Sequence, residues 1–363
     1  MMRLKINDYV RVTIVKYVLS LVFSMLLGCV LIYAQGESPV VAVKAIFEGA
    51  FGSKINIGNT IRWSIPCMMT GAAAIVAFRS GVTNMGLEGQ IYFGAISCAL
   101  VGAYIELPHV PHIVLCIAVA GLAGACYTLV PAILRLFFGV EELISTLMLN
   151  FVALLMTEYI TIWVVMGGSQ AANGSAAITT PQIARTAELT TLIKGTTANT
   201  GFIIGIVILL MIAFFYKYTI QGYSARQVGQ NMAFAKAGGV NVIRNYIGMF
   251  LISGFIAGMC GGIEVSGTYH RFTANFSKNL GWEGIMVTRV AEKNPIALLV
   301  VSFIWGALKA GSMHMERVTN LNRLTVNLIQ MFFVLFVAVD YEALYRSIRK
   351  KIQHRKERKV AAV

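Results

Sequence analysis

The stretch GFIIGIVILLMIAFFYKY, residues 201–218, indicates how this chain folds. It carries no charged side chain before Lys217. A helix of about 20 apolar residues is long enough to cross the hydrocarbon core of a bilayer. Inside that core the backbone must satisfy its own hydrogen bonds, which a helix does within one segment. The stretch therefore predicts a membrane-spanning helix.

Comparable apolar stretches recur along all 363 residues. One of them, residues 284–292, is too short to cross a bilayer alone and is interpreted as a half-helix. Such a segment is tolerated only where protein or a water-filled cavity surrounds the freed backbone groups. We expect about ten membrane segments, at residues 17–34, 61–78, 86–105, 113–137, 143–166, 201–218, 246–266, 284–292, 295–312 and 321–339.

The composition agrees with this pattern. Hydrophobic residues make up 57% of the chain and charged residues 13%, whereas soluble domains carry about 25% charged residues. The predicted fold class is all-α, a polytopic transmembrane helical bundle that forms a single domain over residues 1–363. The six cysteines lie within or beside apolar stretches, which is typical of packing residues rather than of disulfides. No small-residue cleavage site follows the first span, so we expect it to be retained.

The distribution of charge predicts the orientation of the chain. A net charge of +14 could indicate nucleic-acid binding in a soluble protein, but here the basic residues flank apolar spans, as the positive-inside rule describes. The basic segments 1–16, 217–245 and 341–363 are therefore expected in the cytoplasm, and ten passes return both termini to that side. The Ser-, Thr- and Gly-rich segment 167–200 is expected to be an extracytoplasmic loop with a short surface helix around 181–192.

Motifs of nucleotide-binding and hydrolytic enzymes are missing from the sequence. It contains no GxxxxGK[ST] phosphate loop, no HExxH and no GxSxG, so we expect neither a bound nucleotide nor catalysis. His109 and His112 form the only close His pair and lack a third ligand, so no metal site is predicted. Active transport by this chain would draw its energy from a partner protein or from an ion gradient.

Two polar segments interrupt the apolar pattern. In GVTNMGLEGQ, residues 81–90, hydrogen-bonding side chains stand at a glycine-rich break. A carboxylate in a membrane segment usually faces a cavity or a partner group. Glu88 could line a translocation pathway, or it could cap the N-terminus of a neighbouring helix and never meet a solute. From this segment we assign to the pathway Asn84, Glu88 and Gln90.

The second polar segment is GVEELISTLMLN, residues 139–150, which Phe151 follows. Its acidic residues suit the first turn of a helix, where they complement the positive end of the dipole. Asn150 is a lone amide deeper in the span. It could join two helices, a bond worth about 1 kcal/mol, or it could contact a solute. From this segment we assign to the pathway Ser145, Thr146, Asn150 and Phe151.

The cytoplasmic connection is predicted to contain a short helix. Asn231 is a favourable N-cap and Gly238-Gly239 a favourable terminator. The helix could dock into a groove of another protein or lie on the lipid headgroups as an ordinary amphipathic helix. The residues assigned to docking are Asn231, Ala233, Ala235, Gly238 and Gly239.

Glycines at 254, 258 and 262 in the following span are four residues apart and predict a flat face for close helix packing. Glu264, at the end of that span, is interpreted as a carboxylate at the membrane interface.

Together these segments resemble the ABC permeases that import simple sugars and nucleosides. Residues 84–90, NMGLEGQ, are similar to that family's N-x-G-x-E-G-Q signature. Residues 142–150, ELISTLMLN, are similar to its N-E-V-I-S-T-L-M-L-N segment, with Glu141 in place of Asn. Residues 229–240 resemble its coupling loop G-x-N-x-x-A-A-x-Y-x-G-I and differ at Phe234 and Ala237. The resemblance continues in the same order through 252–262, Asn294-Pro295 and Gly306-Ala-Leu, and covers roughly residues 60–340.

The resemblance implies a function and a set of partners. The Glu-Gly-Gln and Ile-Ser-Thr-Leu-Met-Leu-Asn segments are most similar to the nucleoside branch. The resemblance implies a permease subunit that moves a nucleoside, or a related ribosyl or simple-sugar solute, across the bacterial inner membrane into the cytoplasm. ATP and Mg²⁺ would bind to separate ATPase subunits, and this chain would carry no cofactor. The other expected partners are a second, non-identical permease, an extracytoplasmic substrate-binding protein and the lipid bilayer, but no nucleic acid.

Other transport functions stay open. A permease of the same family could carry riboflavin or a simple sugar. An ion-coupled secondary transporter or channel would need an ion site of its own, and the scarcity of buried acids speaks against it. Arg289 lies in TRVAEK, residues 288–293, where the family usually has an apolar A-L-L-G, and it could pair with an acid or contact the solute. Because the assigned pathway side chains are mainly amides and hydroxyls, we predict an uncharged solute.

Overall fold

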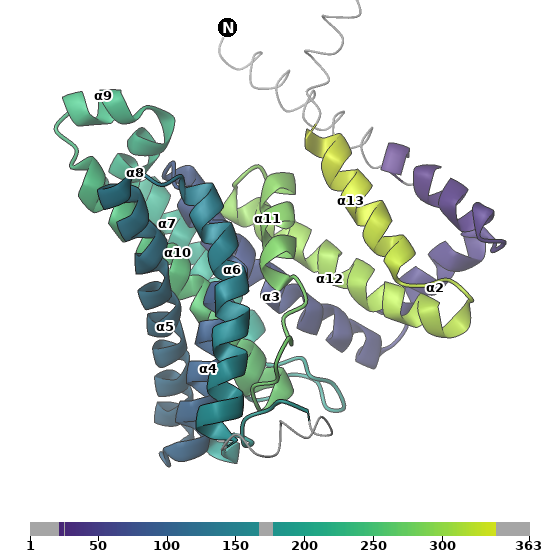
Figure 1. Ribbon diagram of the computed structural model, residues 1–363. Helices are drawn as coiled ribbons and strands as arrows, with labels where there is room; N and C mark the ends of the chain where they lie inside the picture. The colour runs from purple at the N-terminus through teal and green to yellow at the C-terminus, as the bar shows by residue number, and fades with distance from the viewer. Residues whose placement is uncertain (1–21, 25, 167–176, 339–363) are drawn as a thin grey trace, which may run out of the picture. The chain divides into compact units, whose positions relative to one another are not determined.

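The computed structural model describes residues 22–24, 26–166 and 177–338 (Figure 1). In these residues the regular structure is helical, and only two isolated β-bridges are present. The all-α prediction is therefore confirmed. In chain order the elements are α2 (Pro39–Phe51), α3 (Lys54–Arg79), α4 (Leu87–Tyr104), α5 (His109–Phe138), α6 (Glu142–Tyr159), η1 (Ile160–Val165), η2 (Arg185–Ala187), α7 (Gly201–Tyr218), α8 (Ile220–Gln230), α9 (Met232–Ala237), α10 (Val242–Glu264), η3 (Val265–Tyr269), α11 (Leu280–Val290), α12 (Pro295–Val318) and α13 (Leu324–Ala338).

Several helices are long and apolar enough to cross a membrane. Within the described residues there are six, and a seventh if the bent pair Val22–Ala34 and Pro39–Phe51 counts as one span. Helices also occupy the predicted spans 86–105, 284–292 and 321–339, but they are shorter or more polar. A polytopic helical bundle is thus confirmed, while the count of about ten stays a prediction. The six are Lys54–Arg79, His109–Phe138, Glu142–Val165, Gly201–Tyr218, Val242–Tyr269 and Pro295–Val318.

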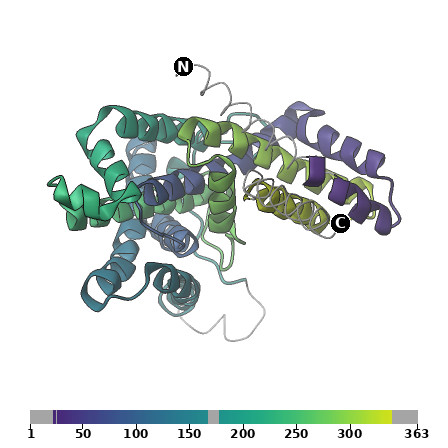
Figure 2. The same cartoon turned by 90° about the horizontal axis from the view of Figure 1, so that it is seen from above.

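The chain divides into two compact units, residues 45–314 and residues 1–44 with 315–363. In the larger unit, α10 packs against α3, α4 and α5 (Figures 1 and 2). Glycines allow these backbones to approach closely, as predicted. A Cβ added at Gly94 would lie 2.2 Å from the carbonyl oxygen of Gly258, and one at Gly258 would lie 2.3 Å from that of Ala120. Gly258 therefore lies where α4, α5 and α10 meet.

The predicted half-helix is α11, which begins at Leu280 rather than at residue 284. It packs closely against α3, because a Cβ added at Gly284 would lie 2.1 Å from Thr70 Oγ1. The Thr288 hydroxyl donates to the carbonyl of Gly71 at 3.0 Å. This side-chain bond joins α11 to the middle of α3.

The described part of the outer loop, residues 177–200, contains the 3₁₀ turn η2 instead of the predicted helix around 181–192. Within η2 the donors bond three positions back, as from Ala187 to Ala184, but several other backbone donors bond to distant carbonyls. Ile183 N–H donates to His270 at 2.9 Å, and Ala184 N–H donates to Gly102 at 2.8 Å. Helical structure within the predicted range is limited to the turn Arg185–Ala187, because tertiary hydrogen bonds engage donors that a longer helix would use.

The smaller unit contains the chain before Lys44 and the chain from Met315 onward. Phe23 and Phe336 lie with their ring centroids 5.8 Å apart. The Gln35 amide donates to the Thr325 hydroxyl at 3.3 Å. These contacts join the two ends of the described chain within this unit.

Candidate functional site

The glycine-rich break between α3 and α4 is closed by a buried amide pair. Asn84 and Gln90 are almost fully buried and bond to each other through both amides, at 3.1 and 2.9 Å. Asn84 also donates to the Ser253 hydroxyl on α10 at 2.9 Å, and Ser253 donates to the Ala73 carbonyl on α3 at 2.9 Å. These two predicted pathway residues therefore join three helices and are absent from the lining of the cavity described below.

The first turns of α6 hold the same break from the other side. The Thr83 N–H donates to the carboxylate of Glu142 at 2.9 Å, and the Tyr246 hydroxyl donates to its second oxygen. The Met85 N–H donates to the Thr146 hydroxyl at 3.2 Å. The Ser145 hydroxyl donates to the Glu142 carbonyl within the helix at 3.2 Å.

Asn150 completes this attachment one turn further along α6. Its Oδ1 accepts the Gly89 N–H and its Nδ2 donates to the Met85 carbonyl, both at 2.9 Å. Both ends of the amide thus bind the backbone at the start of α4. The helix-joining contact considered for Asn150 is therefore present, and its role in the pathway stays a prediction.

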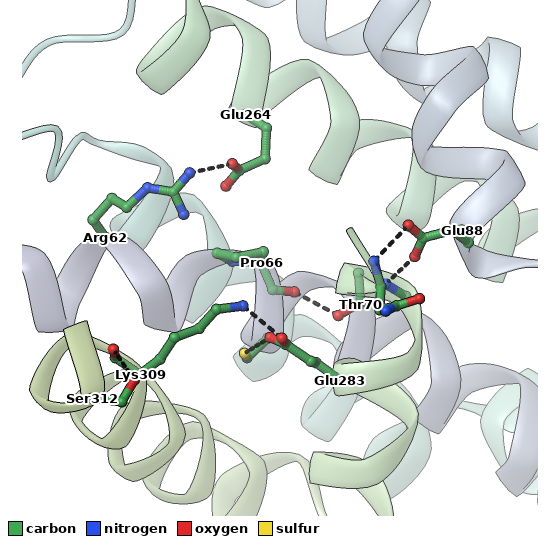
Figure 3. A network of polar contacts seen from close by, with 11 residues as sticks. Arg62, Pro66, Thr70, Glu88, Glu264, Glu283, Lys309 and Ser312 are labelled. Atoms are coloured by element: carbon green, nitrogen blue, oxygen red, sulfur yellow. Dashed lines mark hydrogen bonds and ion pairs between the residues drawn. The ribbon is translucent and has the colours of Figure 1, made fainter. Parts of the chain in front are cut away.

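Glu88 caps the N-terminus of α11. Its two carboxylate oxygens accept the backbone N–H groups of Asn279 at 3.1 Å and of Gly281 at 2.7 Å (Figure 3). The first N–H groups of a helix have no partner within the helix, and the positive end of its dipole favours an anion. This capping contact, the alternative considered for Glu88, is present. It also explains why α11 starts before residue 284.

A cavity of about 490 Å³ opens between α4, α6 and the segment that leads into α11. Three of the predicted pathway residues line it: Glu88, Asn150 and Phe151. Asn84, Gln90, Ser145 and Thr146 do not line it. The remaining lining consists of Tyr92, Leu147, Leu154, Asn275, Lys278, Asn279 and Trp282.

Sequence reasoning missed the contribution of residues 275–282 to this cavity. The segment NFSKNLGW combines amides, a lysine and a tryptophan just before an interrupted helix. Interrupted membrane helices commonly form solute sites, so this combination was the available signal.

Arg289 does not line the cavity, and its guanidinium carbon lies 5.7 Å from the centre of the Phe78 ring. Burial, followed by the charges of Arg289 and Arg79, lowers the pKa of Lys293, which lies between α11 and α12.

Two ion pairs lie inside the larger unit (Figure 3). Arg62 on α3 donates to Glu264 at 2.7 Å, and both side chains are buried. Glu264 is thus buried and paired with a residue of a distant span, while its position at the membrane interface stays a prediction. Lys309 on α12 donates to Glu283 on α11 at 2.6 Å.

The Trp63 ring lies against both cations of these pairs. The Arg62 guanidinium carbon is 3.9 Å from its centroid and Lys309 Nζ is 4.3 Å from it. Cation–π contacts of this kind stabilise a desolvated charge. The four charged groups and the ring therefore form one cluster inside the larger unit.

The predicted short helix of the basic connection is α9, which follows α8 at one end of the bundle (Figure 1). Asn231 accepts the Phe234 N–H at 3.0 Å, so it is the N-cap that the sequence predicts. Gly239 has a φ of +80°, which suits a glycine after a helix.

The assigned docking residues of α9 differ in exposure. Ala235 is fully buried, whereas Asn231, Ala233, Gly238 and Gly239 are exposed. Two large apolar side chains on α9, Met232 and Phe234, are 49% and 65% exposed. The apolar surface that a partner could contact is therefore provided by these two residues.

Relatives with assigned names match most of the chain. It is 28% identical to the guanosine ABC transporter permease protein NupP of Bacillus subtilis, over 89% of this chain and 92% of that protein. It is 26% identical to the nucleoside ABC transporter permease protein NupB of Lactococcus lactis, over 89% and 90% of the two chains. It is also 26% identical to the glucose ABC transporter permease protein TsgB13 of Haloferax volcanii, over 88% and 86%. No solved structure matches.

The family model described as "Branched-chain amino acid transport system / permease component" matches residues 56–339. This range contains the polar break, the cavity, both ion pairs and α9. The chain therefore belongs to the family of branched-chain amino acid transport system permease components.

Proposed function

We propose that this chain is the membrane-spanning permease subunit of an ABC importer that carries a nucleoside into the cytoplasm. The observation that carries the proposal is the similarity to NupP and NupB, which covers about nine tenths of every chain compared. A similarity over this share of both chains relates them along most of their length.

The cavity supports a ring-containing solute, and apart from Lys278 its lining suits an uncharged one. Its volume of about 490 Å³ is within the range of small-molecule sites, roughly 300–1,000 Å³. Phe151, Trp282 and Tyr92 offer ring faces, and Asn275 offers an amide. The one carboxylate of the lining, Glu88, is engaged by two backbone N–H groups. Arg289, the residue that argued for an anionic solute, lies outside the lining.

The same proposal includes the orientation and the partners. We place the chain in the bacterial inner membrane with ten segments and both termini in the cytoplasm, because the basic segments then face inward. The exposed side chains of α9 would contact an ATPase subunit, which binds ATP and Mg²⁺. A second permease and an extracytoplasmic binding protein complete the importer.

A simple-sugar permease is the second candidate. The glucose permease TsgB13 matches this chain over nearly the same length as NupB does. The two candidates differ in whether the solute carries an aromatic base, so competition between solutes separates them.

The test is ATP-driven uptake of labelled guanosine into proteoliposomes that contain the complete importer. Unlabelled nucleosides should compete, whereas glucose, ribose, riboflavin and nucleoside monophosphates should not. Competition by glucose and not by nucleosides would establish the sugar function. Competition by monophosphates that is lost in Arg289→Gln would contradict an uncharged solute. Uptake that needs an ion gradient and no ATP would indicate a secondary transporter.

A further inference from the structure

The segment 275–282 contributes four of the ten residues that line the cavity. It connects η3 to α11, and its backbone is held at several points. The Tyr92 hydroxyl on α4 donates to the Asn275 amide oxygen at 3.4 Å. Phe276 is buried and packs edge-on against the Tyr92 ring, with 5.3 Å between the centroids.

The backbone conformation of this segment is unusual. Asn275, Lys278 and Asn279 have φ values of +58°, +41° and +76°, a region that residues other than glycine rarely adopt. Of the six such residues in the described chain, these three line the cavity. Such conformations persist only where surrounding contacts enforce them, and they concentrate at ligand sites. Here the contacts are the two hydrogen bonds from Asn279 and Gly281 to Glu88.

The two polar side chains that the sequence singled out in this lining are already engaged. Glu88 accepts two backbone N–H groups, and Asn150 binds the backbone with both ends of its amide. A solute could bond to these groups only in competition with contacts that hold the cavity together. They therefore position the lining and do not distinguish one solute from another.

Other side chains are presented to a solute. Phe151 on α6 is 64% exposed and Trp282 is 36% exposed, and Asn275 and Lys278 are exposed as well. The aromatic faces can stack on a flat heterocycle, since every base has a π-face. The amide and the ammonium group can bond to the oxygen and nitrogen atoms on the edge of a ring.

We infer that residues 275–282 are the specificity-determining element of this permease, with Trp282 and Phe151 contacting the base of a nucleoside and Asn275 and Lys278 bonding to its polar edge. The inference rests on the proposed function and assigns residues to it. It assigns recognition to a segment that Glu88 holds in position, instead of to Glu88 and Asn150 themselves.

Photolabelling tests the inference directly. The complete importer in proteoliposomes is irradiated with 8-azidoguanosine, digested and analysed by mass spectrometry. The label should appear on residues 275–282 or on Phe151, and excess guanosine should prevent it while ribose should not. Stacking on an aromatic side chain is lost in Trp282→Ala, and the labelling should fall about tenfold. Trp282→Phe, which keeps a ring, should retain most of it.

Two control variants match these substitutions in chemistry. Trp163→Ala changes an exposed tryptophan on η1, and Lys194→Gln changes an exposed lysine of the outer loop. Neither residue lines the cavity, so both variants should label as the unmodified protein does. Lys278→Gln should weaken guanosine competition severalfold, whereas Lys194→Gln should not.

The outcomes distinguish the inference from the function on which it rests. Guanosine uptake by the unmodified importer, with the label elsewhere or unchanged in Trp282→Ala, would overturn the inference and leave the nucleoside function standing. Absence of ATP-driven nucleoside uptake by the unmodified importer would overturn both. Loss of the second permease from purified Trp282→Ala would show that the segment serves subunit contact and would refute a role in specificity.

Discussion

Removal of one partner of the Arg62–Glu264 pair should destabilise the protein far more than removal of both. The two side chains are buried and only 2.7 Å apart, and they join α3 to the end of α10. In Glu264→Gln a buried guanidinium loses its counter-charge, and in Arg62→Met a buried carboxylate is left alone. A double substitution leaves no charge that needs compensation.

The magnitude follows from the burial of the pair. Breaking a buried ion pair by removing one partner costs about 3–5 kcal/mol, and a single charge deep in a membrane segment costs about 2.5–3.5 kcal/mol on insertion scales. Each single variant should therefore lose about 3 kcal/mol, or more than a hundredfold in the folding equilibrium. The double variant should lose only about 1 kcal/mol, mainly the contact of Arg62 with the Trp63 ring at 3.9 Å.

Denaturation of the purified chain in mixed micelles measures these differences. The free energies of unfolding of the four proteins form a double-mutant cycle, whose coupling term isolates the interaction between the two side chains. We expect a coupling of several kcal/mol, with the double variant more stable than either single variant. If the loss in the double variant equals the sum of the two single losses, the charges act independently and the reasoning is refuted.

Three further substitutions test other contacts. Glu88→Gln replaces one carboxylate oxygen by an NH₂ group, so one backbone N–H at the start of α11 loses its acceptor. The variant should lower the free energy of unfolding by about 1–2 kcal/mol and reduce guanosine uptake. Unchanged values for both would show that the cap is dispensable. Gly94→Ala places a Cβ 2.2 Å from the Gly258 carbonyl oxygen and should cost about 1–3 kcal/mol through overpacking, an expectation that an unchanged melting temperature would contradict. Phe234→Asp changes an exposed side chain of α9 and should abolish stimulation of ATP hydrolysis by loaded binding protein while membrane insertion stays normal; normal stimulation would exclude docking through this surface.

Much of the fold was predictable because membrane segments follow from local composition. Long apolar stretches specify helices wherever they occur, and the glycine spacing in α10 indicated its close packing. The predicted helix boundaries were inaccurate where residues distant in the sequence form hydrogen bonds with the backbone at those boundaries. α11 begins at Leu280 because the Glu88 carboxylate caps it. Within residues 181–192 only the turn Arg185–Ala187 is helical, because the donors of Ile183 and Ala184 bond to His270 and Gly102.

The candidate site was predictable only in part. Sequence identifies a polar side chain inside an apolar span but not what that side chain meets. Asn84 and Gln90 meet each other, whereas Phe151 lines the cavity. Glu264 looked like a surface group because its partner, Arg62, belongs to a distant span. Pairing of this kind depends on how the helices pack against one another. The residue pattern within one span does not show which residue of another span it meets.

The positions of the two ion pairs along the chain indicate that they serve the same purpose. Glu264 is the last residue of α10, and Glu283 lies in the first turn of α11. The residues between them contain η3 and the segment 275–282 that lines the cavity. Arg62 therefore fixes one end of this stretch to α3, and Lys309 fixes the other end to α12. Between these ends Glu88 binds the backbone at Asn279 and Gly281. A chain with three positive φ values in its middle needs such restraint on both sides, because strained backbone relaxes unless its surroundings enforce it. Charge inside a membrane protein is expensive, and the ion pairs at both ends of this cavity-lining segment, one buried and one partly buried, are explained by the need to keep that segment in a single conformation.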